Sequence, residues 1–296
     1  MSELTITKIP PENAHQILEE FLSSRSYLPY FFFSPYVLNT FLTRSLKSLY
    51  IAEFGAENIL LVNKEKLNDI RFLFDHPSTE MIAAVKQYFK PVYMAANQTS
   101  TIPADKPYIS DIEYEIQLQS IADLTNKSIR KKYNQAIRKN IGLTYEIYKP
   151  EHIEGIKAFI EKWNTTRSEE FNKYARTQND LYFLEQYQND PKLIGGVVLD
   201  KGKVVGYTLC VPALNGKLLA MFNKVLRGYT ELGVFLYVER ARQLTALGFS
   251  EVNIGSINND FKTHFLENAV SHIAYNYMIH KEVELINDER YLQMLI

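Results

Sequence analysis

The order of the apolar segments in the second half of the chain is the strongest constraint on its fold. Residues 192–200 and 203–212 are rich in Val, Leu and Ile and are separated by two residues, a spacing typical of a β-hairpin. An Asn-Gly pair then precedes a third strand-like segment at 217–223. A helical pattern runs from 232 to a terminating glycine, and a short apolar segment follows at 251–256. The sequence therefore predicts three antiparallel strands, a crossover helix and a further strand.

The same order of elements recurs in the first half of the chain. Three strand-like segments, a helical pattern and another strand-like segment occupy 49–54, 58–63, 69–76, 78–89 and 91–97. The two halves agree in pattern and not in sequence, which predicts two similar sheet-and-helix domains in tandem. The predicted fold class is α+β, with mixed, mostly antiparallel sheets and crossover helices.

A polar segment with two prolines, 97–115, separates the two halves. We therefore place the domains at 1–110 and 111–296. Beyond the second set of strands, the pattern predicts a helix at 258–270 and a closing strand at 271–283.

Composition limits the class of protein. The chain has 296 residues, of which 33 are Lys or Arg and 34 are Asp or Glu. Its start is polar, and no apolar run approaches the roughly 20 residues that span a bilayer. We therefore expect a soluble, cytoplasmic protein. The single cysteine, Cys210, excludes an internal disulfide, and the six histidines show no metal-binding spacing, so we expect no metal site.

Positive charge is concentrated in residues 126–140, which contain no acid. On a helical wheel Ile129, Tyr133, Ala136 and Ile137 fall in one arc. The remaining surface carries six cations: Lys127, Arg130, Lys131, Lys132, Arg138 and Lys139. The pattern predicts an amphipathic helix with a cationic outer face. That face is either simply solvated or binds a polyanion, such as tRNA, the phosphates of coenzyme A or an anionic lipid headgroup.

The element order and three segments together resemble a known fold family. Three antiparallel strands, a helix and a parallel strand form the core of the N-acyltransferase fold called GNAT. The segment 128–140 (SIRKKYNQAIRKN) resembles the basic helix of tandem GNAT proteins related to Fem-type aminoacyltransferases and phosphatidylglycerol lysyltransferase. Residues 227–256 resemble their core helix and following strand, and 258–268 resembles a stretch that carries a lysine, here Lys262. The resemblance covers 111–283, and the first half by layout alone.

The segment before the core helix departs from one GNAT pattern. Acetyl-CoA-binding members hold the pyrophosphate with a loop of the form Arg/Gln-x-x-Gly-x-Gly/Ala. Here the corresponding residues are LRGYTELG, in which Gly228 and Gly233 have a different spacing. We therefore expect weak binding of acetyl-CoA, although the helix start can still receive an anion. Arg227 and Tyr229 complete the predicted donor-binding loop.

Transfer of an acyl group to an amine requires a deprotonated amine, a polarised carbonyl and a protonated leaving group. Candidate catalytic residues are Tyr207, Asn223 and Lys262, each of which can equally have a structural role. Trp163 and Arg167 belong to a polar segment that is either an acceptor-binding lid or an ordinary connection.

The resemblance implies an acyl- or aminoacyltransferase without a tightly bound cofactor. Its co-substrate would be aminoacyl-tRNA or acyl-CoA, and its acceptor an amine or hydroxyl of a small molecule, a lipid or a peptide. The predicted donor-binding cations are Lys127, Arg130, Lys131 and Arg138. The alternative function is a non-catalytic GNAT-fold module that binds a phosphate-bearing ligand. The sequence does not predict an oligomeric state.

Overall fold

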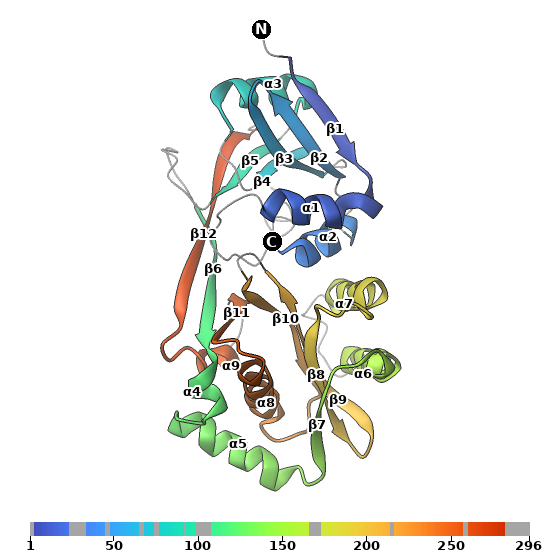
Figure 1. The fold of residues 1–296 in the computed structure, drawn as a ribbon, viewed down its shortest axis with the longest axis vertical. Coiled ribbons are helices and arrows are strands. Elements are labelled where there is room, and N and C mark those ends of the chain that lie inside the picture. The colour runs from blue at the N-terminus through green and yellow to red at the C-terminus, as the bar shows by residue number, and fades with distance from the viewer. Residues whose placement is uncertain are drawn as a thin grey trace. The chain divides into compact units, whose positions relative to one another are not determined.

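The computed structural model describes residues 3–23, 34–44, 48–64, 68–73, 77–91, 93–98, 108–165, 173–213, 216–256 and 260–281 (Figure 1). These residues form two compact units. Unit 1 takes those that fall within 1–21, 41–111 and 273–296, and unit 2 takes those within 22–40 and 112–272.

In unit 1 the strands follow the order β1-β2-β3-β4-β5-β12. They are β1 (Thr5–Ile9), β2 (Ser48–Phe54), β3 (Glu57–Lys64), β4 (Asp69–Leu73), β5 (Tyr93–Gln98) and β12 (Val270–Lys281). Neighbouring strands are antiparallel except β4 and β5, which are parallel and joined by α3 (Thr79–Phe89). The helix begins where Ser78 Oγ accepts the Met81 N–H, and its Met81 and Val85 join the buried core of the sheet. A further helix, α1 (Ala14–Ser23), follows β1.

In unit 2 the strands follow the order β6-β11-β10-β9-β8-β7. They are β6 (Tyr108–Gln117), β7 (Leu143–Ile147), β8 (Ile194–Asp200), β9 (Lys203–Pro212), β10 (Leu218–Val225) and β11 (Glu251–Ser256). Neighbours are antiparallel except β10 and β11, which are parallel and joined by α8 (Leu232–Ala246).

Helices cover both faces of the unit 2 sheet. Successive residues of a strand point to opposite faces of the sheet. The contacts of Tyr207 and Thr208, which are neighbours on β9, therefore show which helices lie on each face. Thr208 faces α8, on which α4 (Leu118–Ala122) and α5 (Lys127–Lys139) pack. Tyr207 packs on Phe159 of α6 (Ile153–Thr165), and Phe222 of β10 packs on Phe183 of α7 (Lys173–Tyr187). The chain also forms α2 (Pro35–Arg44) and α9 (Asp260–Thr263).

The predicted order of three antiparallel strands, a crossover helix and a parallel strand is confirmed in both units. The prediction of a long helix at 258–270 was wrong, because the helix that forms there, α9, has four residues. After Thr263 the chain forms only isolated turns, in which the N–H groups of Phe265 and Leu266 donate to the carbonyl oxygens of Lys262 and Thr263. The predicted domain limits differ from the two units at the described residues 22–23, 34–40, 111 and 273–281 and stay a prediction.

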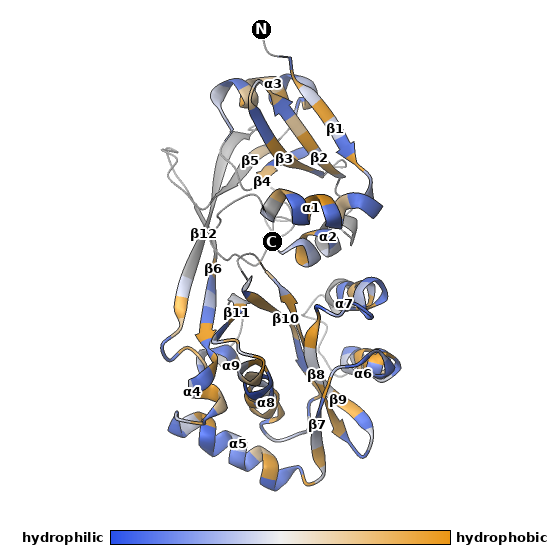
Figure 2. Ribbon diagram, viewed as in Figure 1, coloured by the Kyte–Doolittle hydropathy of each residue, from blue (hydrophilic) through white to orange (hydrophobic). Residues whose placement is uncertain are grey.

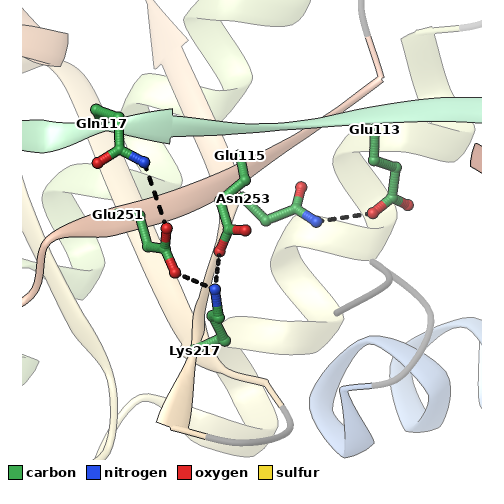
Figure 3. Close-up of polar contacts among 6 residues, drawn as sticks. All are labelled: Glu113, Glu115, Gln117, Lys217, Glu251 and Asn253. Atoms are coloured by element: carbon green, nitrogen blue, oxygen red, sulfur yellow. Dashed lines mark hydrogen bonds and ion pairs between the residues drawn. The ribbon is translucent and has the colours of Figure 1, made fainter. Parts of the chain in front are cut away.

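A polar cluster ties β6, β11 and the start of β10 together. Figure 3 shows its six side chains: Glu113, Glu115, Gln117, Lys217, Glu251 and Asn253. Lys217 Nζ donates to Glu115 Oε1 (2.8 Å) and to Glu251. The hydrogen bond from Lys217 holds the pKa of Glu251 below its usual value. Burial opposes the charge of Lys217, but its bonds to Glu115 and Glu251 outweigh burial and raise its pKa.

Replacing Lys217 by Met should lower the free energy of unfolding at pH 7 by about 2 kcal/mol, because the buried Glu115 carboxylate would lose the Lys217 ammonium. The lowered pKa of Glu251 adds stability above about pH 4.3, which is lost as the pH falls through the folded value. The raised pKa of Lys217 adds stability below about pH 10.4, which is lost as the pH rises through the folded value. Urea unfolding of parent and variant should therefore differ most between these limits, and the difference should shrink as the pH falls through the folded value of Glu251.

Lys149→Met is the matched control, since Lys149 pairs with Glu151 at an exposed site. It should leave stability unchanged at every pH. A Lys217→Met variant that is as stable as the parent at pH 7 would contradict the assigned role of the cluster.

Candidate functional site

The parallel pair β10–β11 stops pairing soon after it begins. Among the described residues its register is a single pair, Leu219 opposite Asn253. In unit 1 the corresponding parallel pair, β4–β5, stays in register over the four residues from Asp69 to Phe72. Backbone groups of β10 beyond Leu219 therefore face a strand that has left the ladder. We call this stretch, β10 residues 220–225 and β11 residues 254–256, the β10–β11 opening.

Two side chains hold β11 out of the ladder. Asn253 Oδ1 accepts the N–H of Gly255 (2.7 Å), and Lys262 Nζ donates to the carbonyl oxygen of Ile254 (2.7 Å). Gly255 has φ +67°, which glycine adopts without strain. The register of β11 against β6 also shifts between Asn253 and Ser256. Two backbone groups that a continuous central strand would use for pairing are thus occupied by side chains, one of them from the predicted catalytic residue Lys262.

The segment between β10 and α8 meets α5 and α9 at the start of α8. Asn140, at the end of α5, donates to the Thr230 carbonyl oxygen (2.7 Å) and accepts the Thr230 N–H (3.1 Å). Lys132 Nζ lies 2.7 Å from His264 Nε2 and 4.0 Å from Glu231 Oε2. The N–H groups of the first helical turn carry a partial positive charge. Helix α5 and the loop, which carry the two sets of predicted donor-binding residues, are therefore neighbours, and the contacts between them are made by other residues.

Tyr133 fixes the inner face of α5 on α8. Its ring stacks on Phe235 (5.7 Å between centroids), and its hydroxyl donates to Glu239 and accepts from Arg242 Nη1 (2.6 Å). Burial and the bond to Glu239 raise the pKa of Tyr133 to about 12. Ile129 and Ala136 are buried as predicted.

The prediction that Ile137 is also buried was wrong, because its side chain is 47% exposed. On the helical wheel the buried face centres between Ile129 and Tyr133, and Ile137 lies at its far edge.

The outer face of α5 is cationic, and Figure 2 shows the hydrophilic character of this helix. Five of its basic side chains are exposed: Lys127, Arg130, Lys131, Arg138 and Lys139. Arg130 and Arg138 donate to the nearby carbonyl oxygens of Leu124 and Asn134. None of the five forms an ion pair with a carboxylate in the part of the chain that the structure describes.

The predicted donor-binding loop is only partly suited to a phosphate. Arg227 and Gly228 are exposed, and Gly228 has φ +96°. Tyr229 donates its hydroxyl to Asp200 Oδ2 (2.8 Å). A Cβ on Gly233 would lie 2.8 Å from the Phe261 ring. Gly233 is therefore small because a ring of the protein packs against it, which differs from a glycine that lets a pyrophosphate approach.

Tyr207 and Trp163 belong to one buried cluster on the face of α6 and α7. Asp180 accepts from both the Tyr207 hydroxyl and Lys224 Nζ, and that ammonium lies 5.1 Å from the Trp163 ring centroid. Burial and Asp180 raise the pKa of Tyr207 well above 10. The Tyr207 proton is thus bonded to a carboxylate in this structure. Arg167, the other predicted residue of this segment, lies outside the described residues.

Asn223 faces the other side of the sheet. Its Oδ1 accepts from Thr208 Oγ1 (2.8 Å) and from Arg240 Nη1 (2.5 Å) of α8. The three predicted catalytic side chains therefore lie apart: Tyr207 under α6 and α7, Asn223 under α8, and Lys262 on β11.

Sequence reasoning missed Asp180, Asn253 and Arg240. Arg240 had a usable signal, since it is a charge in a helix that is apolar on nearly every side. Asp180 and Asn253 had none, because their partners Tyr207, Lys224 and Gly255 are decided by folding.

Among the described residues, no helix is long and apolar enough to cross a membrane, and no group of three or more His, Cys, Asp or Glu side chains is placed to hold a metal ion. Cys210 is buried, which raises its pKa to about 11.

No family model and no curated protein matches this sequence, but solved structures do. A conserved protein of unknown function from Bacteroides thetaiotaomicron matches with a TM-score of 0.68 at 13% identity, covering 94% of this chain and 100% of that one. The C-terminal domain of a putative lysylphosphatidylglycerol synthetase from Agrobacterium fabrum gives 0.58 at 11% identity, with 92% and 93% covered. A tandem GNAT protein from the clavulanic acid biosynthesis pathway gives 0.50 at 11% identity, with 95% and 100% covered. The chain therefore has the GNAT-like α+β fold that its element order and its segments resemble.

Proposed function

We propose that unit 2 is an acyl- or aminoacyltransferase, which moves an acyl group from an activated, phosphate-bearing donor to an amine or hydroxyl. The observation that carries this proposal is the β10–β11 opening. The corresponding strands of unit 1 pair over four residues, so the same topology does not by itself produce an opening.

The opening provides what acyl transfer requires of a protein. Unpaired N–H groups of β10 can bind an extended donor and polarise its carbonyl, as an oxyanion hole does. The donor's acyl carbon would then lie between two strands held apart by Asn253 and Lys262.

The charges around the start of α8 support a donor with phosphates. The helix start favours an anion, and α5 adds five exposed cations along about 20 Å of helix. That length exceeds what one pyrophosphate needs and suits the repeated phosphates of an RNA. The Phe261 ring packs against Gly233, and this contact disfavours the binding of a pyrophosphate close to the backbone of Gly233. We therefore favour aminoacyl-tRNA over acyl-CoA as the donor.

A non-catalytic binding module is the second candidate. Two predicted catalytic side chains favour this candidate, because each forms a hydrogen bond within the protein. Tyr207 donates to Asp180, and Lys262 donates to the carbonyl oxygen of Ile254. Turnover of any donor separates the two functions.

The donor can be identified by a panel of acetyl-CoA, longer acyl-CoAs and aminoacyl-tRNAs, each offered with primary amine acceptors. We expect product only from aminoacyl-tRNA, and acetyl-CoA binding weaker than about 100 µM by calorimetry. Low-micromolar binding and turnover of acetyl-CoA would show an ordinary acetyltransferase instead. Aminoacyl-tRNA that binds without turnover would establish the binding module.

Replacing Arg130, Lys131 and Arg138 by Gln should weaken tRNA binding by roughly 1 kcal/mol for each lost phosphate contact. The slope of log Kd against log salt should also fall by about one per contact. The fold should persist, because the buried residues of α5 are unchanged. Filter binding at several salt concentrations provides both quantities.

A matched control replaces Lys149, Lys162 and Lys192 by Gln, which removes equal charge from exposed positions outside α5 and the predicted donor-binding loop. This control should bind tRNA as the parent does. Equal loss in both triple variants would mean that net charge alone acts, and no loss in either would mean that the α5 face is simply solvated.

Lys262 has two possible roles that substitution can separate. If it holds the Ile254 carbonyl, Lys262→Arg should keep most activity, because Arg also donates there, and Lys262→Met should raise KM as β11 closes on β10. If Lys262 transfers a proton, Arg should be as inactive as Met, because Arg does not deprotonate in proteins. Steady-state kinetics of both variants decide between these roles.

A further inference from the structure

Arg240 is a buried cation without a counter-ion in the described structure. Its side chain is 1% exposed, and Nη1 bonds to two neutral groups, Asn223 Oδ1 (2.5 Å) and Thr208 Oγ1 (3.5 Å). Its guanidinium lies 4.2 Å from the Tyr237 ring centroid. Nε and Nη2 have no hydrogen-bond partner among the described residues. A buried charge with unsatisfied donors opposes folding, so its presence requires another explanation.

Arg240 fixes the orientation of the Asn223 amide. A guanidinium has donors only, so the amide atom that it contacts must be the oxygen, Oδ1. Thr208 lies directly opposite Asn223 on β9 and donates to the same oxygen. The oxygen and nitrogen of an amide diverge at Cγ, so with Oδ1 bonded to Thr208 on β9 the Nδ2 group is directed away from Thr208, and the strand on the side of β10 away from β9 is its neighbour. That neighbour is β11, whose register with β10 among the described residues is the single pair Leu219 and Asn253.

Within the described structure, the two protons of Asn223 Nδ2 are therefore left for a ligand at the β10–β11 opening. No described residue accepts a hydrogen bond from Nδ2, and Asn223 is only half-buried. A cation and a hydroxyl on Oδ1 polarise the amide and make its N–H groups stronger donors. A fixed, polarised donor in this place suits an oxygen that gains negative charge during a reaction.

We propose that Asn223 Nδ2 donates to the carbonyl oxygen of the transferred acyl group, and that Arg240 is the residue that positions Asn223 for this role. The inference rests on the proposed acyl transfer and names a catalytic donor and its support within that site. When the amine nitrogen attacks, the new C–N bond forms and the carbonyl π pair moves to the oxygen, where Asn223 stabilises it. The pair then returns, the bond to the leaving oxygen or sulfur breaks, and the leaving group takes the proton that the amine gives up.

The kinetic test uses Asn223→Asp, Arg240→Met and the control Arg242→Met, with the donor that the panel identifies. Asn223→Asp keeps the size of the side chain and its contact with Arg240 but removes both donors, so kcat should fall about 10²–10³-fold with little change in KM. Arg240→Met should lower kcat about tenfold or more, yet melt at the parent's temperature or higher, because it removes an uncompensated buried charge. Arg242→Met removes an ion pair of the same helix that faces α5, and should keep kcat.

A purely structural Arg240 gives the opposite pattern, with a lower melting temperature and an unchanged kcat in Arg240→Met. That pattern, or an Asn223→Asp variant with the parent's kcat, would overturn the proposal.

The orientation can also be measured without any substrate, by NMR of protein labelled with ¹⁵N at asparagine. Asn223→Asp identifies the amide signals of Asn223 by their loss. In the parent these signals should form one sharp pair. In Arg240→Met they should double or broaden, because the Thr208 hydroxyl alone can donate to Oδ1 or accept from Nδ2 and so permits both orientations. Unchanged signals would refute positioning by Arg240.

If the parent protein turns over no donor, the proposed function fails, and the catalytic role of Asn223 fails with it. The NMR result still decides whether Arg240 positions the Asn223 amide.

Discussion

The structure of unit 2 depends on keeping one parallel strand pair open in the middle of a sheet. A central strand normally satisfies its backbone groups on both sides, and leaving them unpaired is costly. Here Asn253 occupies the Gly255 N–H and Lys262 occupies the Ile254 carbonyl, so β11 can leave β10 with two of its groups satisfied. Just before β10, Lys217 bonds to Glu115 of β6 and to Glu251 of β11, and these bonds hold the three strands together. The opening is therefore limited at one end by an ion cluster and maintained along β11 by side chains.

Two features of unit 2 oppose stability. The outer face of α5 gathers five cations with no described acid to pair with them, and Arg240 is buried with two donors unsatisfied. Like charges in one place repel, and a buried charge loses hydration. The surrounding packing tolerates both, since Tyr133 fixes α5 on α8 and the helix places Arg240 over Asn223. Destabilising features of this kind are expected at binding and catalytic sites, because a bound ligand can supply the missing charges and hydrogen-bond acceptors.

The sequence by itself determined the order of the core elements in both units, although the helix expected at 258–270 has only four residues. Strand and helix periodicity, the turn between β8 and β9 and the glycine after α8 are local signals, because they depend on residues that are close in the chain. The same holds for the amphipathic pattern of α5, although the edge of its buried face was misjudged at Ile137. Local patterns also indicated the cations of α5 and the unusual loop before α8, so one half of the candidate site could be predicted.

Only the tertiary structure decided which side chains meet. Asn223 and Arg240 are 17 residues apart, Tyr207 and Asp180 are 27 apart, and Asn140 and Thr230 are 90 apart, so no periodic pattern connects them. Gly233 looked like part of a phosphate loop, but the packing of Phe261 explains why that residue is small. The opening itself has no sequence signature, because it results from a change of strand register and from side chains that satisfy backbone groups. A sequence fixes local preference, whereas register and the sharing of hydrogen bonds are settled only when distant segments compete for the same groups.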